Sequence, residues 1–153
     1  GRIIGEACHF MDLAIYLTGS KIKSVSMSAL GNNPEESTDN AILTLKFANG
    51  SQAVVNYFAN GSKAYSKERF EIYVQNKTLV IDNFRTMKGY GFKGFKSMKS
   101  KQDKGHAEQF KRYINFLNVG GKPLIPFEEI VNSSKASFAA LAALKTNSIV
   151  EIT

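Results

Sequence analysis

The spacing of apolar residues predicts a helix at the start of the chain and a run of strands after it. Apolar positions recur every three or four residues over 6–18, which predicts a first helix, and Gly19 suits its C′ position. Apolar and polar residues then alternate with a period of two, as in half-buried strands. The predicted strands span residues 21–30, 40–47 and 52–59. The Asn49-Gly50 pair between the last two predicts a hairpin turn.

The second half of the chain predicts a further hairpin and then a return to helices. Residues 68–75 and 78–82 read as strands that turn through Asn76-Lys77, whereas residues 86–104 are rich in Gly and Lys and show no period. A helix is predicted over 106–119, with an apolar stripe of Phe110, Tyr113, Ile114 and Leu117. A third, alanine-rich helix runs from Pro126 to about residue 145, and residues 149–152 form a short final strand.

This order of elements defines the expected fold class. A helix, a run of antiparallel strands and two further helices predict an α+β fold, a largely antiparallel open sheet with helices on one face. The 153 residues are enough for a single domain with its own core, and no linker divides the chain. We therefore expect one domain over residues 1–153.

Composition narrows the class of protein. Hydrophobic residues make up 43% and charged residues 22%, as in ordinary globular proteins. The single cysteine, Cys8, excludes an internal disulfide, and with only two histidines, His9 and His106, no metal site is expected. No apolar run approaches the ~18 residues of a membrane span, and no signal-peptide pattern is present. We expect a cytoplasmic protein with no membrane partner.

The positive charge is concentrated in one stretch of the chain. The net charge is +7, and residues 85–104 hold seven basic residues opposed only by Asp103. These residues are Arg85, Lys88, Lys93, Lys96, Lys99, Lys101 and Lys104. Such a run attracts phosphates, carboxylates or nucleic acid, and it is also typical of a solvated loop.

Two glycine-rich patterns within this stretch suggest nucleotide chemistry. Residues 89–94 match G-x-G-x-x-G, but a dinucleotide site also needs a helix opening from the last glycine, and none is predicted there. Lys88 to Phe95 and Ile72 to Asn76 are similar to the two motifs of RNA-recognition domains. Only eleven residues, 77–87, separate them, too few for the helix and strand that should intervene. We expect no nucleic-acid partner and retain a basic RNA-binding module as the alternative function.

The first helix carries the best candidate for catalysis. Glu6, His9, Asp12 and Tyr16 fall on one face at 100° per residue. A histidine and two carboxylates in this arrangement can move protons near neutral pH. On spacing alone, the set is more typical of the solvated face of an amphipathic helix.

Short segments along nearly the whole chain resemble one family in their order. They are Gly1-Arg2-Ile3-Ile4, His9 with Asp12, Tyr16-Leu17-Thr18-Gly19, Ser66 to Glu71, Asp82 to Arg85, Lys104 to Glu108 and Pro126 to Glu129. Together they resemble the C-terminal domain of the Gfo/Idh/MocA oxidoreductases, the family of glucose–fructose oxidoreductase and inositol dehydrogenase. The subgroup most similar includes bi-domain and sugar-nucleotide-type dehydrogenases.

The resemblance implies a fold, a cofactor and a missing half. The fold would be the C-terminal α/β domain of glucose–fructose oxidoreductase-like dehydrogenases, which is similar to that of dihydrodipicolinate reductase. A Rossmann domain would precede residue 1 and bind NAD or NADP, so no cofactor-binding residue is assigned in this chain. The chain opens without methionine, directly into a helix, which also leads us to expect a fragment that is inactive alone.

The resemblance also implies roles for individual residues. His9 matches the catalytic histidine, which would take or relay the proton of a sugar, sugar-nucleotide or polyol hydroxyl, and Asp12 matches the aspartate that follows it. The family's first aspartate falls on Gly5, so Glu6 is expected as the second catalytic residue. Asp12 would contact substrate or orient the imidazole. Further substrate contacts are expected from Lys67 and Arg85, which are equally consistent with surface charges on a hairpin. His106 is a weaker candidate, since an exposed loop histidine is the favoured interpretation there. Packing of sheets would make the protein a homo-oligomer.

Overall fold

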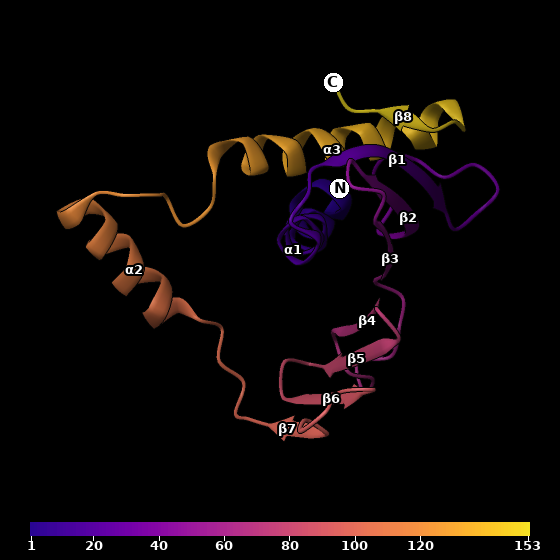
Figure 1. Cartoon of the computed structure of the whole chain (residues 1–153). Coiled ribbons are helices and arrows are strands. Elements are labelled where there is room, and N and C mark those ends of the chain that lie inside the picture. The colour runs from indigo at the N-terminus through magenta and orange to yellow at the C-terminus, as the bar shows by residue number, and fades with distance from the viewer. The chain divides into compact units, whose positions relative to one another are not determined.

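Contacts along the chain group its residues into two units. The computed structural model describes all of residues 1–153. Unit 1 comprises Gly1–Asn60 and Gly121–Thr153, and unit 2 comprises Gly61–Gly120. Figure 1 shows helices and antiparallel strands in both parts of the chain. The α+β class is confirmed, with the strands divided between two four-stranded sheets.

Unit 1 is built from a four-stranded sheet and helices from both ends of the chain. Its elements are η1 (Ile3–Ala7), α1 (Cys8–Thr18), β1 (Ile22–Ala29), β2 (Asn40–Phe47), β3 (Gln52–Phe58), α3 (Phe127–Thr146) and β8 (Val150–Glu151). The strand order is β3-β2-β1-β8, and every neighbouring pair is antiparallel; we call this sheet A. The predicted strands of this unit are confirmed to within about two residues at each end.

The first helix differs from its prediction at its N-terminal end. It begins at Ile3 rather than at residue 6, and residues Ile3–Ala7 form a π-helical turn before α1 starts at Cys8. The predicted end is confirmed: Gly19 adopts a left-handed φ of 60°, which glycine tolerates without steric cost, and its N–H donates to the Ile15 carbonyl. Period counting missed the start because a π turn is too short to set a period.

The core of unit 1 lies between sheet A and one layer of helices. Ile3, Ala7, Met11 and Ile15 are spaced by four residues and form the buried face of η1 and α1. They pack with Leu43 and other apolar residues that alternate along the strands. On α3 the buried residues are mostly alanines, and small side chains let a helix backbone approach a sheet closely. Figure 1 shows α3 lying along sheet A.

One buried side chain ties α3 to sheet A by hydrogen bonds. The Asn132 amide accepts from the Ile22 N–H at 2.7 Å through Oδ1 and donates to the Ile22 carbonyl at 3.0 Å through Nδ2. Ile22 begins β1, where the pairing with β2 is irregular between Ile22 and Ser24. Asn132 therefore satisfies both backbone groups of a residue where the ladder is irregular.

Unit 2 contains the second sheet and one helix. Its elements are β4 (Arg69–Val74), β5 (Lys77–Asp82), β6 (Thr86–Tyr90), β7 (Ser97–Lys99) and α2 (His106–Val119). The strand order is β4-β5-β6-β7, antiparallel throughout; we call this sheet B. Gln75 and Asn76 both have positive φ values, 48° and 59°, as a two-residue hairpin turn of type I′ requires. The predicted β4–β5 hairpin and the helix over 106–119 are confirmed.

The interpretation of residues 86–104 as a segment without regular structure is wrong, because β6 and β7 lie there. The sequence pattern did not indicate β6 because Gly89 occupies a position on the apolar face of the sheet, where alternation would place an apolar residue. A Cβ on Gly89 would lie 2.5 Å from the Phe95 ring, so this ring, from the turn between the strands, occupies the space above the glycine. Phe95, six residues after Gly89, thus supplies the apolar group at this position. The sequence of β6 therefore lacks the alternation of apolar and polar residues that marks a strand.

Sheet B has one apolar and one polar face. Paired residues of antiparallel strands point to the same side, so the register assigns each residue to a face. The apolar face comprises Phe70, Ile72, Leu79, Ile81, Met87, Gly89 and Met98. All the apolar residues of unit 2 keep some exposure, and Phe110, Tyr113, Ile114 and Leu117 of α2 are between 49% and 67% exposed. The predicted apolar stripe on α2 is present but uncovered.

Candidate functional site

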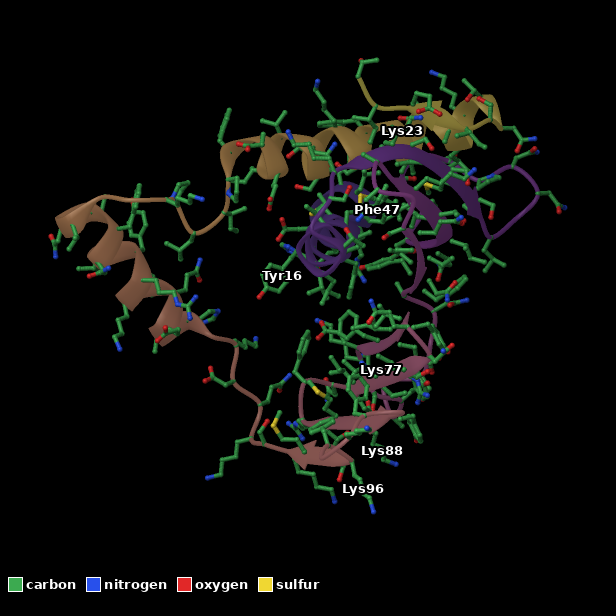
Figure 2. The ribbon with its side chains drawn as sticks, in the orientation of Figure 1. Tyr16, Lys23, Phe47, Lys77, Lys88 and Lys96 are labelled. Atoms are coloured by element: carbon green, nitrogen blue, oxygen red, sulfur yellow. The ribbon has the colours of Figure 1, made fainter.

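The polar residues of the first helix lie on the side that faces away from the core. Glu6 and His9 are exposed, Asp12 is half-buried, and Tyr16 is 79% exposed. Figure 2 shows the Tyr16 side chain projecting from α1. Unit 1 thus presents an imidazole and two carboxylates from the consecutive elements η1 and α1.

The π turn changes the geometry between Glu6 and His9. Glu6 belongs to η1, whereas His9 and Asp12 belong to α1, so the spacing of 100° per residue holds only for the last two. π turns inside helices occur often at functional sites. A Cβ on Gly5, where the family's first aspartate would fall, would have nothing within 4 Å. The backbone therefore has room for a side chain at position 5.

No hydrogen bond or ion pair joins Glu6, His9 and Asp12 to one another. Their charges are felt instead at Cys8, the helix residue between them. Burial raises the pKa of the Cys8 thiol, and the carboxylates of Glu6 and Asp12 raise it further, against the lowering effect of hydrogen bonds from backbone N–H groups. The thiol stays protonated at neutral pH, so Cys8 is a poor nucleophile. His9 remains the candidate for proton transfer on this helix.

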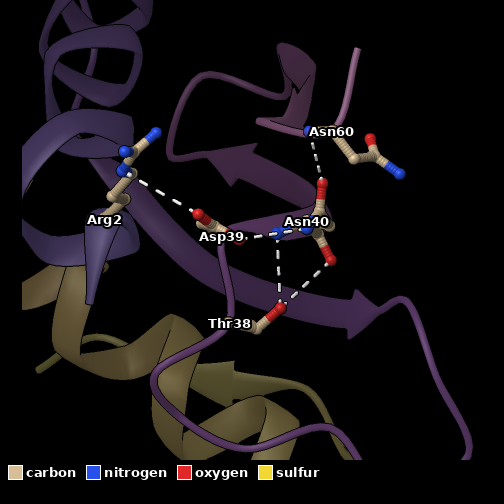
Figure 3. Close-up of polar contacts among 5 residues, drawn as sticks. All are labelled: Arg2, Thr38, Asp39, Asn40 and Asn60. Atoms are coloured by element: carbon tan, nitrogen blue, oxygen red, sulfur yellow. Dashed lines mark hydrogen bonds and ion pairs between the residues drawn. The ribbon is translucent and has the colours of Figure 1, made fainter.

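A polar cluster joins Arg2, just before this helix, to the residues that lead into β2, and the sequence patterns did not indicate it. Figure 3 shows Arg2 paired with Asp39 at 3.8 Å from Nε to Oδ2. Asn40 donates to Asp39 Oδ1 at 3.0 Å, and its own Oδ1 accepts from the Asn60 N–H at 3.0 Å. Thr38 Oγ1 accepts from the Asn40 N–H at 3.2 Å. The Thr-Asp-Asn run just before a strand was the available signal, since such side chains bind nearby backbone groups.

The remaining predicted site residues belong to unit 2. The Glu68 carbonyl accepts from the Asn83 N–H at 2.7 Å, and Arg69 of β4 lies opposite Asp82 of β5 in the strand register. Lys67 and Arg85 flank these pairs, so they lie at the same end of sheet B. Lys67 pairs with Glu68 at 3.7 Å and is otherwise exposed, as is Arg85. His106 begins α2 and is exposed.

The glycine-rich segment is not arranged as a dinucleotide cradle. Gly89 lies in β6, Gly91 and Gly94 lie in the turn that follows, and no helix opens from them. Nowhere in residues 1–153 do three or more His, Cys, Asp or Glu side chains gather in a way that could hold a metal ion. The helices are all too short or too polar to cross a membrane.

Comparison with known proteins identifies the class. The sequence model of the family described as GFO/IDH/MocA C-terminal domain matches residues 1–80, more than half of the chain. The chain belongs to this family of oxidoreductases. No curated protein matches the sequence.

Solved structures of dehydrogenases share the fold. Levoglucosan dehydrogenase in complex with NADH matches with a TM-score of 0.78 and 17% identity over 97% of this chain and 49% of its own. UDP-N-acetylglucosamine 3-dehydrogenase from Acidithiobacillus ferrooxidans matches with a TM-score of 0.72 and 15% identity, over 91% of this chain and 45% of its own. An NAD-binding protein from Listeria innocua matches with a TM-score of 0.68 and 20% identity, over 99% of this chain and 47% of its own. The chain spans about half the length of these structures.

Proposed function

We propose that this chain is the substrate-binding and oligomerisation domain of an NAD(P)-dependent oxidoreductase that acts on a hydroxyl of a sugar, sugar nucleotide or polyol. The observation that carries the proposal is His9. Its imidazole lies exposed and unpaired on the first helix of a domain of this family, next to a π turn. The fold shared with levoglucosan and UDP-N-acetylglucosamine dehydrogenases supports the substrate class.

In the proposed reaction this chain handles the proton and the substrate, while another domain holds the cofactor. The G-x-G-x-x-G segment lies in β6 and the turn that follows, and no helix opens from its last glycine, so it does not form the pyrophosphate seat of a dinucleotide site. We infer that a Rossmann domain precedes Gly1, as the half-length matches suggest. The oxidised nicotinamide bound there would accept the hydride. His9 would take the hydroxyl proton, a task suited to imidazole near neutral pH.

The other candidate residues, in each of the two units, have supporting roles in this proposal. Glu6 provides the carboxylate that Gly5 lacks, and Asp12 contacts a neighbouring hydroxyl of the substrate. Lys67 and Arg85, at one end of sheet B, are suited to a phosphate or carboxylate group on the substrate. His106 is the weakest of these assignments, because nothing near it marks a ligand. A cytoplasmic location is part of the proposal, in keeping with the single cysteine.

Nicotinamide reduction tests the proposed activity. The complete protein that contains this chain is expected to reduce NAD or NADP with at least one compound from a panel of sugars, sugar nucleotides and polyols. The isolated chain is expected to give no turnover, because it lacks a pyrophosphate cradle. Nicotinamide absorbance, followed over time, measures both. Turnover by the isolated chain, or none by the complete protein with the whole panel, would refute the proposal.

The outer face of sheet A is the proposed oligomer contact. The helices cover the other face, and antiparallel sheets often keep one face open. Ile42, Val54 and Phe58 are between 40% and 60% exposed on the outer face, next to a shallow hollow lined by Ser26, Thr44 and Ser148 among others. These apolar side chains lie on neighbouring strands, where a second sheet could cover them.

Sedimentation tests the oligomer. The chain is expected to self-associate, and Val54→Lys is expected to shift it toward the monomer because a charge would be buried at the contact. Ile130→Lys, which changes an exposed residue of α3 on the other side of sheet A, is the matched control and should leave the mass unchanged. A monomer at high concentration for the unchanged chain would contradict this part of the proposal.

A further inference from the structure

The two units differ sharply in charge. Unit 2 holds 13 of the chain's 20 lysine and arginine residues but only five of its 13 aspartate and glutamate residues. Unit 2 therefore carries a net charge of +8, while unit 1 is close to neutral at −1. A surface of one sign on a small unit attracts polyanions and accelerates their binding.

The polar face of sheet B combines this charge with two exposed aromatic rings. Thr78 of β5 pairs with Tyr73 of β4 on one side and with Tyr90 of β6 on the other. The three side chains share one face, and the tyrosines are 71% and 56% exposed. They lie two strand spacings apart, about 10 Å. Exposed aromatic rings on a basic sheet are the platforms on which single-stranded bases stack.

One of the two rings is braced by its neighbours. The Tyr73 hydroxyl donates to Glu71 Oε2 at 2.5 Å, and Arg69 donates to Glu71 Oε1 at 3.1 and 2.7 Å from Nε and Nη2. These bonds lower the pKa of Glu71 and raise that of Tyr73, so the carboxylate stays ionised and the phenol stays protonated. The bonds restrict the ring before a ligand arrives, which reduces the entropy cost of stacking.

Two exposed lysines lie on the same face as the rings, and one of the two acidic residues of this face is bound by other side chains. Lys88 aligns with Glu71 and Val80, and Lys99 aligns with Thr86 in the next row; both lysines are exposed. Figure 2 labels Lys88 on sheet B. The Glu71 carboxylate is bound by Arg69 and Tyr73, and Asp82 Oδ1 is buried. The face therefore presents positive charge to solvent.

Only part of the RNA-recognition resemblance contributes to this face. Lys88 and Tyr90 lie on it, whereas Phe95 packs over Gly89 on the opposite side and meets Phe92 edge-on at 6.3 Å between ring centroids. The short connection between the two motifs excludes the topology of an RNA-recognition domain. It does not exclude the surface, because β5 alone lies between Tyr73 and Tyr90.

We propose that the polar face of sheet B binds single-stranded nucleic acid, with bases stacked on Tyr73 and Tyr90 and phosphates on Lys88 and Lys99. The rings favour this ligand over an acidic polypeptide, since every base offers a flat π face. This binding is independent of the proposed dehydrogenase activity, and either can fail without the other.

Fluorescence anisotropy of the whole chain with a labelled uridine oligomer of about 12 nucleotides tests the proposal. Affinity is expected to fall as salt rises. Tyr73→Ala combined with Tyr90→Ala is expected to weaken binding about tenfold or more, and Lys88→Glu is expected to weaken it and reduce the salt dependence. Tyr73→Phe keeps the ring and is expected to cost little. Circular dichroism checks that each variant is folded.

Matched variants and competitors decide between stacking and general attraction. Tyr65→Ala, at a tyrosine of unit 2 that is 70% exposed outside sheet B, and Lys46→Glu, in unit 1, are expected to leave the affinity unchanged. Equal binding of heparin, with no effect of the tyrosine changes, would overturn the proposal. Binding to phosphatidylserine vesicles but not to the oligomer would also overturn it.

Discussion

Replacing His9 by alanine is expected to reduce the turnover of the complete oxidoreductase by about 10²- to 10⁴-fold, the usual contribution of a positioned acid–base group. The stability of the protein should hardly change, because the side chain is exposed and makes no hydrogen bond in this chain. Steady-state kinetics with the best substrate of the panel, together with a thermal melt, measure both quantities.

A control on the same helix separates chemistry from general damage. Leu17→Ala changes an apolar residue of α1 that is 47% exposed and lies outside the polar set, so it should keep turnover within about twofold. If His9→Ala kept the turnover of the unchanged enzyme, the assignment of the proton-transfer role to His9 would be wrong.

The carboxylate at Glu6 can be tested in the same assay. Glu6→Gln is expected to lower turnover, and adding Gly5→Asp to that variant is expected to restore part of it, since a side chain at position 5 meets no other atom within 4 Å. Unchanged turnover in Glu6→Gln would remove Glu6 from the proposed mechanism while leaving His9 in place.

Replacing Asn132 by alanine is expected to reduce the free energy of unfolding by about 2–4 kcal/mol. The change leaves the N–H and the carbonyl of Ile22 without the partners that they have on α3, in a part of the core where the Ile22 side chain is 1% exposed. A buried backbone group without a hydrogen bond costs about 1–3 kcal/mol. Urea denaturation followed by circular dichroism measures the change.

A second asparagine gives the matched control. Asn115 lies on α2, is exposed, and its side chain forms no hydrogen bond with another residue, so Asn115→Ala should change stability by no more than about 0.5 kcal/mol. Equal stability losses in the two variants would show that the Asn132 bonds to β1 contribute nothing specific.

The elements that the sequence predicted well are those whose signals are local. Period-two alternation located β1, β2 and β3, and the Asn49-Gly50 turn set the hairpin between β2 and β3, because a pleated strand with one buried face needs apolar residues at alternate positions. Glycine at position 19 marked the end of α1. The order of short segments that resemble the Gfo/Idh/MocA family predicted the class of protein, and the family match over residues 1–80 confirmed it.

The elements that the sequence predicted poorly depend on atoms supplied from elsewhere in the chain. β6 was missed because Phe95 covers Gly89, and the π turn was missed because one turn sets no period. The Arg2–Asp39 pair joins residues 37 positions apart, which neither pattern nor propensity indicates. For the site, the sequence predicted that Glu6, His9 and Asp12 share one helical face, and the structure altered the position of Glu6 by placing it in a π turn.

The sequence by itself determined the α+β class, most element boundaries and the basic segment, because composition, periodicity and turn chemistry act over a few neighbouring residues. The candidate histidine came from the resemblance of ordered segments to the family. Tertiary structure alone decided the division into two sheets, the Asn132 link between α3 and β1, and the meeting of Tyr73 with Tyr90 on one face. These arise from strand register and from packing between distant segments, where the free energy is set by which surfaces come together.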